Sequence, residues 1–257
     1  MRRLVISIAM LAICVCVTSC YARPWIRGSG HLLTEERSVA EFHALELRGI
    51  GRVYVTQGER QELVVTTDDN IMPHLRTDVR SAKLVIYVEP PMYRVTSLEV
   101  HVTMVKVRSL ALSGSGIIKG QNQIRSDRLD IGISGSGDAE LDIMAKEVAT
   151  RLSGSGALTL HLDSGALESH ISGSGKLYLS GQSRAHRFKS SGAGKLYAFD
   201  LQTVDTSATI SGSGKCEIAV SNHLNVKVSG SGSVRYRGNP KINSRMSGSG
   251  RLEAAED

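Results

Sequence analysis

A four-residue signature recurs eight times in the second half of the chain at a nearly constant spacing. Seven copies read Ser-Gly-Ser-Gly, one reads Ser-Gly-Ala-Gly, and successive copies begin 18 to 21 residues apart. A fixed period of this length is typical of a solenoid, in which each repeat forms one coil that stacks on its neighbours. The copies begin at Ser113, Ser134, Ser153, Ser172, Ser191, Ser211, Ser229 and Ser247.

Apolar residues recur at every second position on both sides of the signatures, which is the periodicity of a β-strand rather than a helix. Before the second copy, Leu129, Ile131 and Ile133 follow this pattern. Around the third copy, Leu152 and Leu158 have the same parity as the two glycines between them, and the serines have the opposite parity. The pattern predicts two strands per coil that meet at the signature, with the glycines inside and the serines outside.

We expect each signature to form a sharp corner between two strands. Glycine suits such a corner because the inner side has no room for a side chain, and because glycine reaches the positive φ angles of a sharp bend. Stacked coils would align the serine hydroxyls in ladders that hydrogen-bond one another. A flexible Gly/Ser linker is the alternative, but it does not require in-phase Ile, Leu and Val around it. The expected corner glycines are Gly114, Gly116, Gly135, Gly137, Gly154, Gly156, Gly173, Gly175, Gly192, Gly194, Gly212, Gly214, Gly230, Gly232, Gly248 and Gly250.

The chain before the first signature also has strand periodicity, over residues 42–112. Arg48-Gly49-Ile50-Gly51 resembles a degenerate first signature, and we expect longer loops and one short helical turn near Met72 to Leu75. At about nineteen residues per coil, residues 39–257 would form roughly eleven coils. The sequence therefore predicts a single all-β solenoid domain over residues 39–257, with regular repeats from 113 to 250.

The first nineteen residues resemble a bacterial lipoprotein signal peptide. Arg2 and Arg3 precede an apolar stretch that is too short for a comfortable membrane span, and Val17-Thr18-Ser19-Cys20 closes it. In such proteins the chain is cut before the cysteine, and acyl chains on the cysteine anchor the protein to a bilayer. An ordinary cleaved secretory signal and an uncleaved anchor are the alternatives. We expect residues 1–19 to be removed, lipid to be attached at Cys20, and residues 20–38 to form a spacer.

One cysteine, Cys216, would then remain unmodified, because Cys14 and Cys16 lie within the signal peptide. No intramolecular disulfide is possible with a single thiol, so the coils must hold together without covalent links. Cys216 shares the inward parity of Gly214 and Ile218, and we predict a buried small apolar residue rather than a nucleophile.

The charge and the absence of known motifs argue against several function classes. A net charge of +6 favours anionic partners without specifying one. The sequence has no helix-based motif for reading nucleic acid, and export would separate the protein from most nucleic acid, so we expect no such partner. Gly-Lys follows the signature glycines at Lys176, Lys195 and Lys215, but no Ser or Thr comes next, as a phosphate-binding loop requires.

Metal and catalytic sites are also not expected. A calcium-binding β-roll needs an aspartate at the same place in each repeat, and only Asp138 directly follows a signature. The eight histidines lack the spacing of metal ligands. Short repeats leave little length for the side loops on which β-helical polysaccharide lyases carry their carboxylates. We therefore expect no cofactor, no metal and no enzymatic activity, with a polysaccharide-active β-helix enzyme as the alternative.

Basic and aromatic residues recur at outward positions just after the later signatures. Stacking would align them in a stripe suited to sugars or to anionic polymers such as envelope polysaccharide. A purely structural role is the alternative, because aromatic pairs across rungs stabilise sheets and lysines discourage edge aggregation. The candidate binding stripe consists of Lys176, Tyr178, Lys195, Tyr197, Phe199, Lys215, Arg235, Arg237 and Arg251.

Three features of the chain resemble one protein family. They are the signature repeats, the entry Phe42-His43-Ala44-Leu45-Glu46-Leu47 followed by Gly49-Ile50-Gly51-Arg52-Val53, and the closing Val234-Arg235-Tyr236-Arg237-Gly238-Asn239-Pro240 before the last signature. Over about residues 40–252, the chain is similar to the putative auto-transporter adhesin head domain family, also called the GIN domain. The resemblance implies a single-stranded right-handed parallel β-helix on an exported, often lipid-anchored bacterial envelope protein. It implies no enzyme and no particular functional residues.

We therefore expect a non-enzymatic, lipid-anchored protein of the cell envelope whose β-helical surface serves adhesion, glycan binding or envelope scaffolding. Tyr21, rather than Asp, after Cys20 favours the outer membrane in a host with two membranes. The expected partners are the membrane, through the N-terminal lipid, and an envelope polysaccharide or a protein. A self-associating structural protein is a further alternative, because solenoids with uncapped ends stack on one another.

Overall fold

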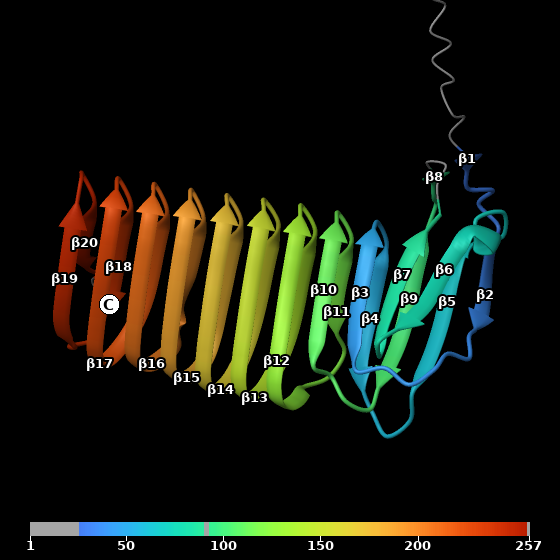
Figure 1. The fold of residues 1–257 in the computed structure, drawn as a ribbon, viewed down its shortest axis with the longest axis horizontal. Coiled ribbons are helices and arrows are strands. Elements are labelled where there is room, and N and C mark those ends of the chain that lie inside the picture. The colour runs from blue at the N-terminus through green and yellow to red at the C-terminus, as the bar shows by residue number, and fades with distance from the viewer. Residues whose placement is uncertain (1–25, 90–92, 256–257) are drawn as a thin grey trace, which may run out of the picture.

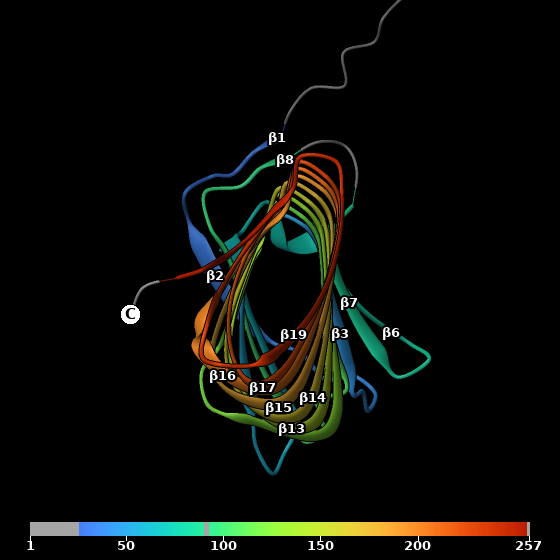
Figure 2. The same cartoon turned by 90° about the vertical axis from the view of Figure 1, so that its left-hand side faces the viewer.

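The computed structural model describes residues 26–89 and 93–255 and forms a parallel β-solenoid of about eight turns, as the sequence predicts (Figure 1). The predicted signal peptide, Cys20 and Trp25 lie outside the described residues. Seen along its axis, the stack is a flattened ring with two long sides (Figure 2). We call the side that follows each Ser-Gly corner wall A, and the side that leads to the next corner wall B.

Each regular coil is one long strand that contributes to both walls. In β14 (Ala157–Gly173), residues 157–164 pair with the next coil in wall A, residues 166–173 pair in wall B, and Gly165 lies at the bend. All these pairings are parallel. The stack from its first regular coil comprises β10 (Ser109–Gly114), β11 (Ile117–Gly120), β12 (Ile124–Gly135), β13 (Asp138–Gly154), β14, β15 (Lys176–Gly192), β16 (Lys195–Gly212) and β17 (Lys215–Gly230).

The lumen between the walls is filled by the inward side chains that the alternation predicts. In wall A, Leu158, Leu177 and Leu196 are in register on successive coils, and all three are fully buried. Burying one such side chain contributes about 1.5–3 kcal/mol. The prediction for Cys216 is confirmed, because it continues this column and is 1% exposed.

The two glycines of a signature play different parts, which corrects the prediction that both face the inside. The first glycine of each copy has φ between +102° and +128°. A Cβ on Gly173 would lie 2.7 Å from the carbonyl oxygen of Gly154, so the neighbouring coil excludes a side chain there. The second glycine faces the lumen, where a Cβ on Gly175 would lie 3.4 Å from Cδ2 of the buried Leu152 and 3.1 Å from the carbonyl oxygen of Gly156.

The predicted hydrogen bonds between signature serines are absent from the part of the chain that the structure describes. The serine side chains point outward but bond to no protein group, and the rungs are joined by the backbone instead, with Ser155 N donating to Gly135 O at 2.9 Å. The rung spacing itself allows such bonds, because the inward Ser164 Oγ donates to Ser183 Oγ on the next coil at 2.9 Å.

The N-terminal part of the domain is irregular, which corrects the estimate of eleven coils. The degenerate signature is confirmed, because Gly49 in β3 (Ala44–Gly49) pairs in register with Gly114. Beyond this coil, β7 and β9 stack on β3 and β4, whereas the remaining strands pair antiparallel: β2 with β5, β5 with β9 and β6 with β7. The bounds are β2 (Leu32–Glu36), β4 (Arg52–Gln57), β5 (Glu62–Asp68), β6 (Leu75–Arg80), β7 (Lys83–Val88) and β9 (Leu98–Met104).

Residues 26–38, assigned to a spacer from the sequence, are already part of the folded body. β1 (Ile26–Arg27) pairs with β8 (Tyr93–Arg94), and β2 joins the main sheet. The buried carboxylate of Asp68 accepts the backbone N–H groups of Gly30 at 2.9 Å and Thr96 at 2.8 Å. Burial raises the pKa of Asp68, whereas these hydrogen bonds lower it. The hydrogen bonds together have the larger effect, so the pKa of Asp68 lies below its usual value.

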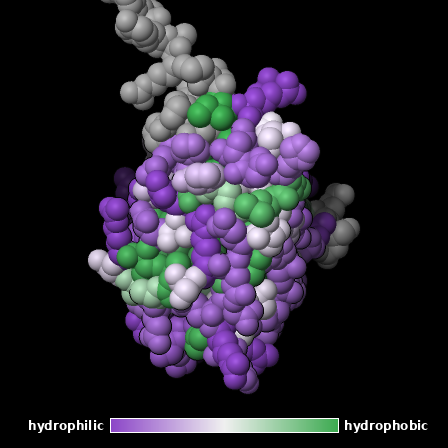
Figure 3. All heavy atoms as spheres, turned by 90° about the vertical axis from the view of Figure 1, so that its right-hand side faces the viewer, coloured by the Kyte–Doolittle hydropathy of each residue, from purple (hydrophilic) through white to green (hydrophobic). Residues whose placement is uncertain are grey.

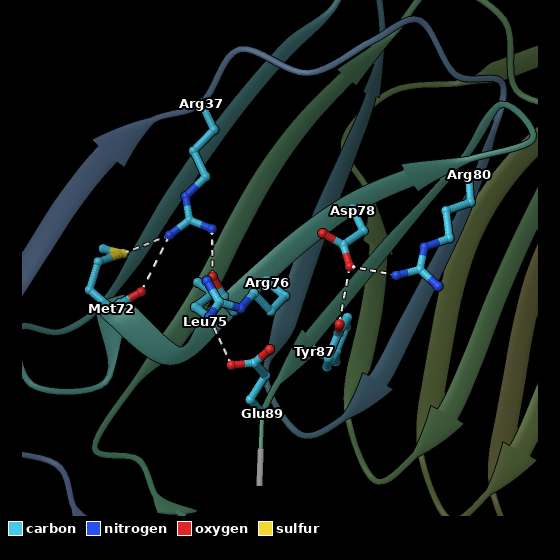
Figure 4. A network of polar contacts seen from close by, with 8 residues as sticks. All are labelled: Arg37, Met72, Leu75, Arg76, Asp78, Arg80, Tyr87 and Glu89. Atoms are coloured by element: carbon cyan, nitrogen blue, oxygen red, sulfur yellow. Dashed lines mark hydrogen bonds and ion pairs between the residues drawn. The ribbon is translucent and has the colours of Figure 1, made fainter.

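Arg37 closes the N-terminal end of the lumen. Its guanidinium donates to the carbonyl oxygen of Leu75 at 2.8 Å and contacts the backbone of Met72 in the helical turn η1 (Met72–His74), which confirms the predicted turn (Figure 4). Nearby, Arg76 pairs with Glu89 at 2.8 Å. This end of the molecule is mainly hydrophilic, with separate hydrophobic patches (Figure 3).

The C-terminal end has no such cover. The last coil consists of β18 (Ser233–Arg237), β19 (Lys241–Ser247) and β20 (Arg251–Ala254). Within the described residues, β19 pairs only with β17 and β20 only with β18, so each has one free edge. Ile242, an inward position of β19, is 43% exposed.

Candidate binding surface

The predicted stripe lies on the outer face of wall A over the later coils. One outward column holds Lys176, Lys195 and Lys215 in direct register, and Arg251 ends the column after Ser233. The next outward column holds Tyr178, Tyr197, Glu217 and Arg235 in register. The parallel stacking of β15 to β18 and β20 therefore brings residues that are 18 to 20 positions apart in the sequence side by side.

The aromatic members of the stripe make specific ring contacts. The rings of Tyr178 and Tyr197 are stacked, with centroids 4.9 Å apart and planes at 11°. The ring of Phe199 lies where the pairing of β16 with β17 shifts register, and the guanidinium groups of Arg235 and Arg237 lie 5.7 Å and 4.4 Å from its centroid. The predicted stripe thus contains two aromatic clusters beside the lysine column.

The lysine column is not neutralised by neighbouring acids. Arg235 pairs with Glu217 at 3.2 Å, but Lys176, Lys195, Lys215 and Arg251 form no ion pair within residues 26–89 and 93–255. Like charges on adjacent rungs repel one another, because neighbouring strands are only about 4.8 Å apart. An anion that spans several rungs would remove this repulsion.

A second basic column on wall B was not singled out from the sequence. Arg151, Lys189 and Lys227 share one outward column with His170 and Thr209 between them. Lys189 is paired with Glu168 at 3.8 Å, and none of these five residues is a Tyr, Phe or Trp. The column has a similar number of cations without the aromatic component, which makes it a matched reference for wall A.

A shallow recess of about 360 Å³ lies on wall B, close to the bend where each coil passes from wall A to wall B. It is lined by small residues, including Ala166 and Ala185, and by the charged residues Glu147, Glu168 and Arg187. Because its rim mixes both charges, it favours no single class of ligand.

Several polar side chains face the lumen, a feature that the alternation did not reveal. His186 is 2% exposed, and its Nε2 lies 3.2 Å from Ser169 Oγ on the previous coil, while its Nδ1 has no partner among the described residues. Burial lowers the pKa of His186 to about 4. Its inward parity, shared with Phe188, was the available signal. Burial likewise raises the pKa of the Cys216 thiol, so both groups are neutral near pH 7.

Two further observations concern membranes and metals. Across the described ranges, the structure contains no helix with the length and apolar character needed to cross a membrane. In the same residues, no three His, Cys, Asp or Glu side chains are grouped so as to hold a metal ion.

Solved structures share the fold over nearly the whole chain. A protein from Parabacteroides distasonis, described as a putative lipid binding protein, is 24% identical, with a TM-score of 0.87 over 91% of this chain and 100% of that chain. A putative adhesin from Parabacteroides merdae is 22% identical, with a TM-score of 0.87 over 90% and 99% of the two chains. One from Bacteroides fragilis, also 22% identical, covers 90% and 100% with a TM-score of 0.70.

A comparison with curated proteins finds no match. The family model described as "Putative auto-transporter adhesin, head GIN domain" matches residues 41–161 and 142–240, and the expected resemblance is thereby confirmed. The match covers the entry strands, the repeats and the closing motif, so this chain belongs to that family.

Proposed function

We propose that this protein is a non-enzymatic, lipid-anchored component of the bacterial cell envelope, placed in the outer membrane through Cys20. We further propose that wall A binds an extended anionic polymer, such as an acidic envelope polysaccharide. Membership of an adhesin head family supports an envelope location. The signal-like N-terminus supports the anchor.

The observation that carries the binding proposal is the unpaired column of Lys176, Lys195 and Lys215 beside the Tyr178–Tyr197 stack. Three cations at the rung repeat suit a ligand that carries repeated negative charges and runs along the solenoid axis. The tyrosine rings add flat amphipathic surface, which suits the faces of sugar rings. A small monovalent anion would use only one rung.

The proposal of no catalysis rests on where the reactive groups lie. The two most strongly shifted pKa values among the described residues belong to His186 and Cys216, which are 2% and 1% exposed. Cys216 lies in the inward leucine column, and His186 borders the wall B recess, away from the stripe, with its Nε2 next to Ser169 Oγ. The stripe itself contains cations and aromatic rings but no carboxylate pair for acid–base chemistry on a sugar.

The test compares two charge-matched triple variants of the full chain. One is Lys176→Gln/Lys195→Gln/Lys215→Gln on wall A, and the other is Arg151→Gln/Lys189→Gln/Lys227→Gln on wall B. Retention on immobilised acidic and neutral polysaccharides is measured as a function of salt. We expect the wall A variant to bind the acidic polymer at least about tenfold more weakly, a loss of about 1.4 kcal/mol, and the wall B variant to bind like the wild type. Equal losses in both variants, or no binding by the wild type, would refute the proposal.

A further inference from the structure

The two ends of the solenoid differ in shape, although both have free strand edges. At the N-terminal end, β2 pairs only with β5 and β6 only with β7 among the described residues, and the hairpin of β6 and β7 projects out of the ring, so this end is irregular (Figure 2). At the C-terminal end, β19 pairs along β17 and β20 along β18, each with one free strand edge among the described residues, and the end of β20 runs toward the outside of the ring. A free, flat edge is a template for pairing with another strand.

The strands at this end run in opposite directions and match in height. β19 leads to the last Ser-Gly corner and β20 leaves it, so Ser247 and Arg251 flank the corner. One step away from the corner lie Met246 and Leu252, and a second step reaches Arg245 and Glu253. Met246 and Leu252 are both partly buried against the core, whereas Arg245 and Glu253 are exposed.

We propose that the C-terminal end binds the same end of a second copy about a two-fold axis parallel to the strands. Under this symmetry β19 of each copy lies antiparallel to β20 of the other. Residues at equal height then face each other: Met246 meets Leu252 of the second copy, and Arg245 meets Glu253 of the second copy. The dimer thus contains each of these contacts twice.

Charge and polarity support this register. Neither Arg245 nor Glu253 has an ion pair among the described residues of its own chain, although both are charged and exposed. In the dimer they become opposite charges on facing strands, a favourable cross-strand pair. The apolar contact between Met246 and Leu252 continues the lumen across the junction, and Ile242, an inward residue four positions before Met246, is 43% exposed in the single chain.

The symmetry also decides the size of the assembly. A contact of like with like closes after two copies, whereas joining a C-terminal end to an N-terminal end would continue into a filament. The axis keeps both Ser-Gly edges on the same side of the dimer. β1, where the described chain begins, lies toward that edge (Figure 1). Under the proposed lipid anchor, both copies would therefore attach to one bilayer.

The test uses charge exchange in the full chain, purified in detergent and followed by sedimentation over a range of concentrations. The variants are Arg245→Glu, Glu253→Arg, their combination, and an equimolar mixture of the two single variants. Arg151→Glu is the control, because Arg151 lies in the same outward column as Arg245 but five coils earlier, away from the free edge. Thermal unfolding checks that each variant is folded.

We expect the wild type and Arg151→Glu to show a monomer–dimer equilibrium, and each single variant at the edge to dimerise at least about tenfold more weakly. The double variant and the mixture should both recover the dimer, because each then places opposite charges in contact. A monomeric wild type, growth beyond dimers, or a mixture that stays monomeric would each overturn the proposal.

Discussion

The ring of Tyr178 stacks on the ring of Tyr197, one coil further along wall A, at a centroid distance of 4.9 Å. Such a pair contributes about 0.5–1.5 kcal/mol beyond its buried area. We predict that Tyr178→Ala combined with Tyr197→Ala lowers the free energy of unfolding by about 1–2 kcal/mol and weakens retention on acidic polysaccharide. Denaturant unfolding and the retention assay measure the two effects separately.

A second outcome would separate structure from binding at this pair. If the double variant loses stability but binds the polymer like the wild type, the tyrosines serve the sheet alone. Tyr87→Ala, at the N-terminal end, is the control for loss of a half-buried tyrosine outside the stripe, where the hydroxyl donates to Asp78 at 3.1 Å.

The first glycine of a signature should not tolerate a side chain. We predict that Gly173→Ala destabilises the protein by more than about 1–3 kcal/mol, because backbone strain at positive φ alone has that cost, and the Cβ would lie 2.7 Å from Gly154 O. Gly132→Ala is the matched control, since a Cβ there meets nothing within 4 Å. Unfolding curves of the two variants test this, and equal stabilities would contradict the account of the corner.

Stability should depend on pH through His186. Burial lowers the pKa of His186 from an ordinary 6.5 to about 4, so between these values the unfolded chain binds the proton that the folded chain excludes. The folded state therefore keeps its full stability above pH 6.5 and loses about 3 kcal/mol from this residue as the pH falls to about 4.

The measurement for His186 is the pH dependence of unfolding in the wild type and in His186→Leu. Leucine fits the column, because Leu167 occupies the equivalent inward position one coil earlier. The difference in unfolding free energy between the two proteins should change by about 3 kcal/mol across this range. Replacement of the exposed His161 should leave the wild-type profile unchanged, and a flat difference for His186→Leu would contradict the prediction.

Lipid attachment has a direct chemical test. We predict that cells fed a palmitate analogue label the wild type and do not label Cys20→Ala. Cys216→Ala should label normally, because that thiol is buried. Label retained in Cys20→Ala would exclude Cys20 as the acceptor. In a separate experiment, protease treatment of intact cells would show on which side of the membrane the domain lies.

The alternation of inward and outward residues along the strands made the regular part of the fold predictable. Two-residue alternation placed Cys216 inside, and the spacing of Gly49 and Gly51 aligned the entry strands with the first full signature. The same alternation occurs in parallel and antiparallel strands. It therefore gave no indication that β5 pairs antiparallel with β9, or that β6 pairs antiparallel with β7. That choice depends on contacts between distant residues, such as the bond from Arg37 to the backbone of Leu75.

The candidate site was also predictable in part. Register alone brings Lys176, Lys195 and Lys215 together, because equal spacing from successive corners puts them on one column. The position of Phe199 under Arg237 was not predictable in the same way, since it depends on a shift of register between β16 and β17. The burial of the polar pair His186 and Ser169 was also not singled out from the sequence.

The pairing of Gly154 with Gly173 is repeated, residue for residue, by the pairing of Gly173 with Gly192. A deletion or duplication of one whole repeat would consequently rejoin equivalent surfaces, whereas an extra residue within a repeat shifts the register only locally, as it does between β15 and β16. Genes that encode this architecture are thus free to gain or lose whole repeats during evolution. Each such change alters the distance between the C-terminal end of the solenoid and its N-terminal end.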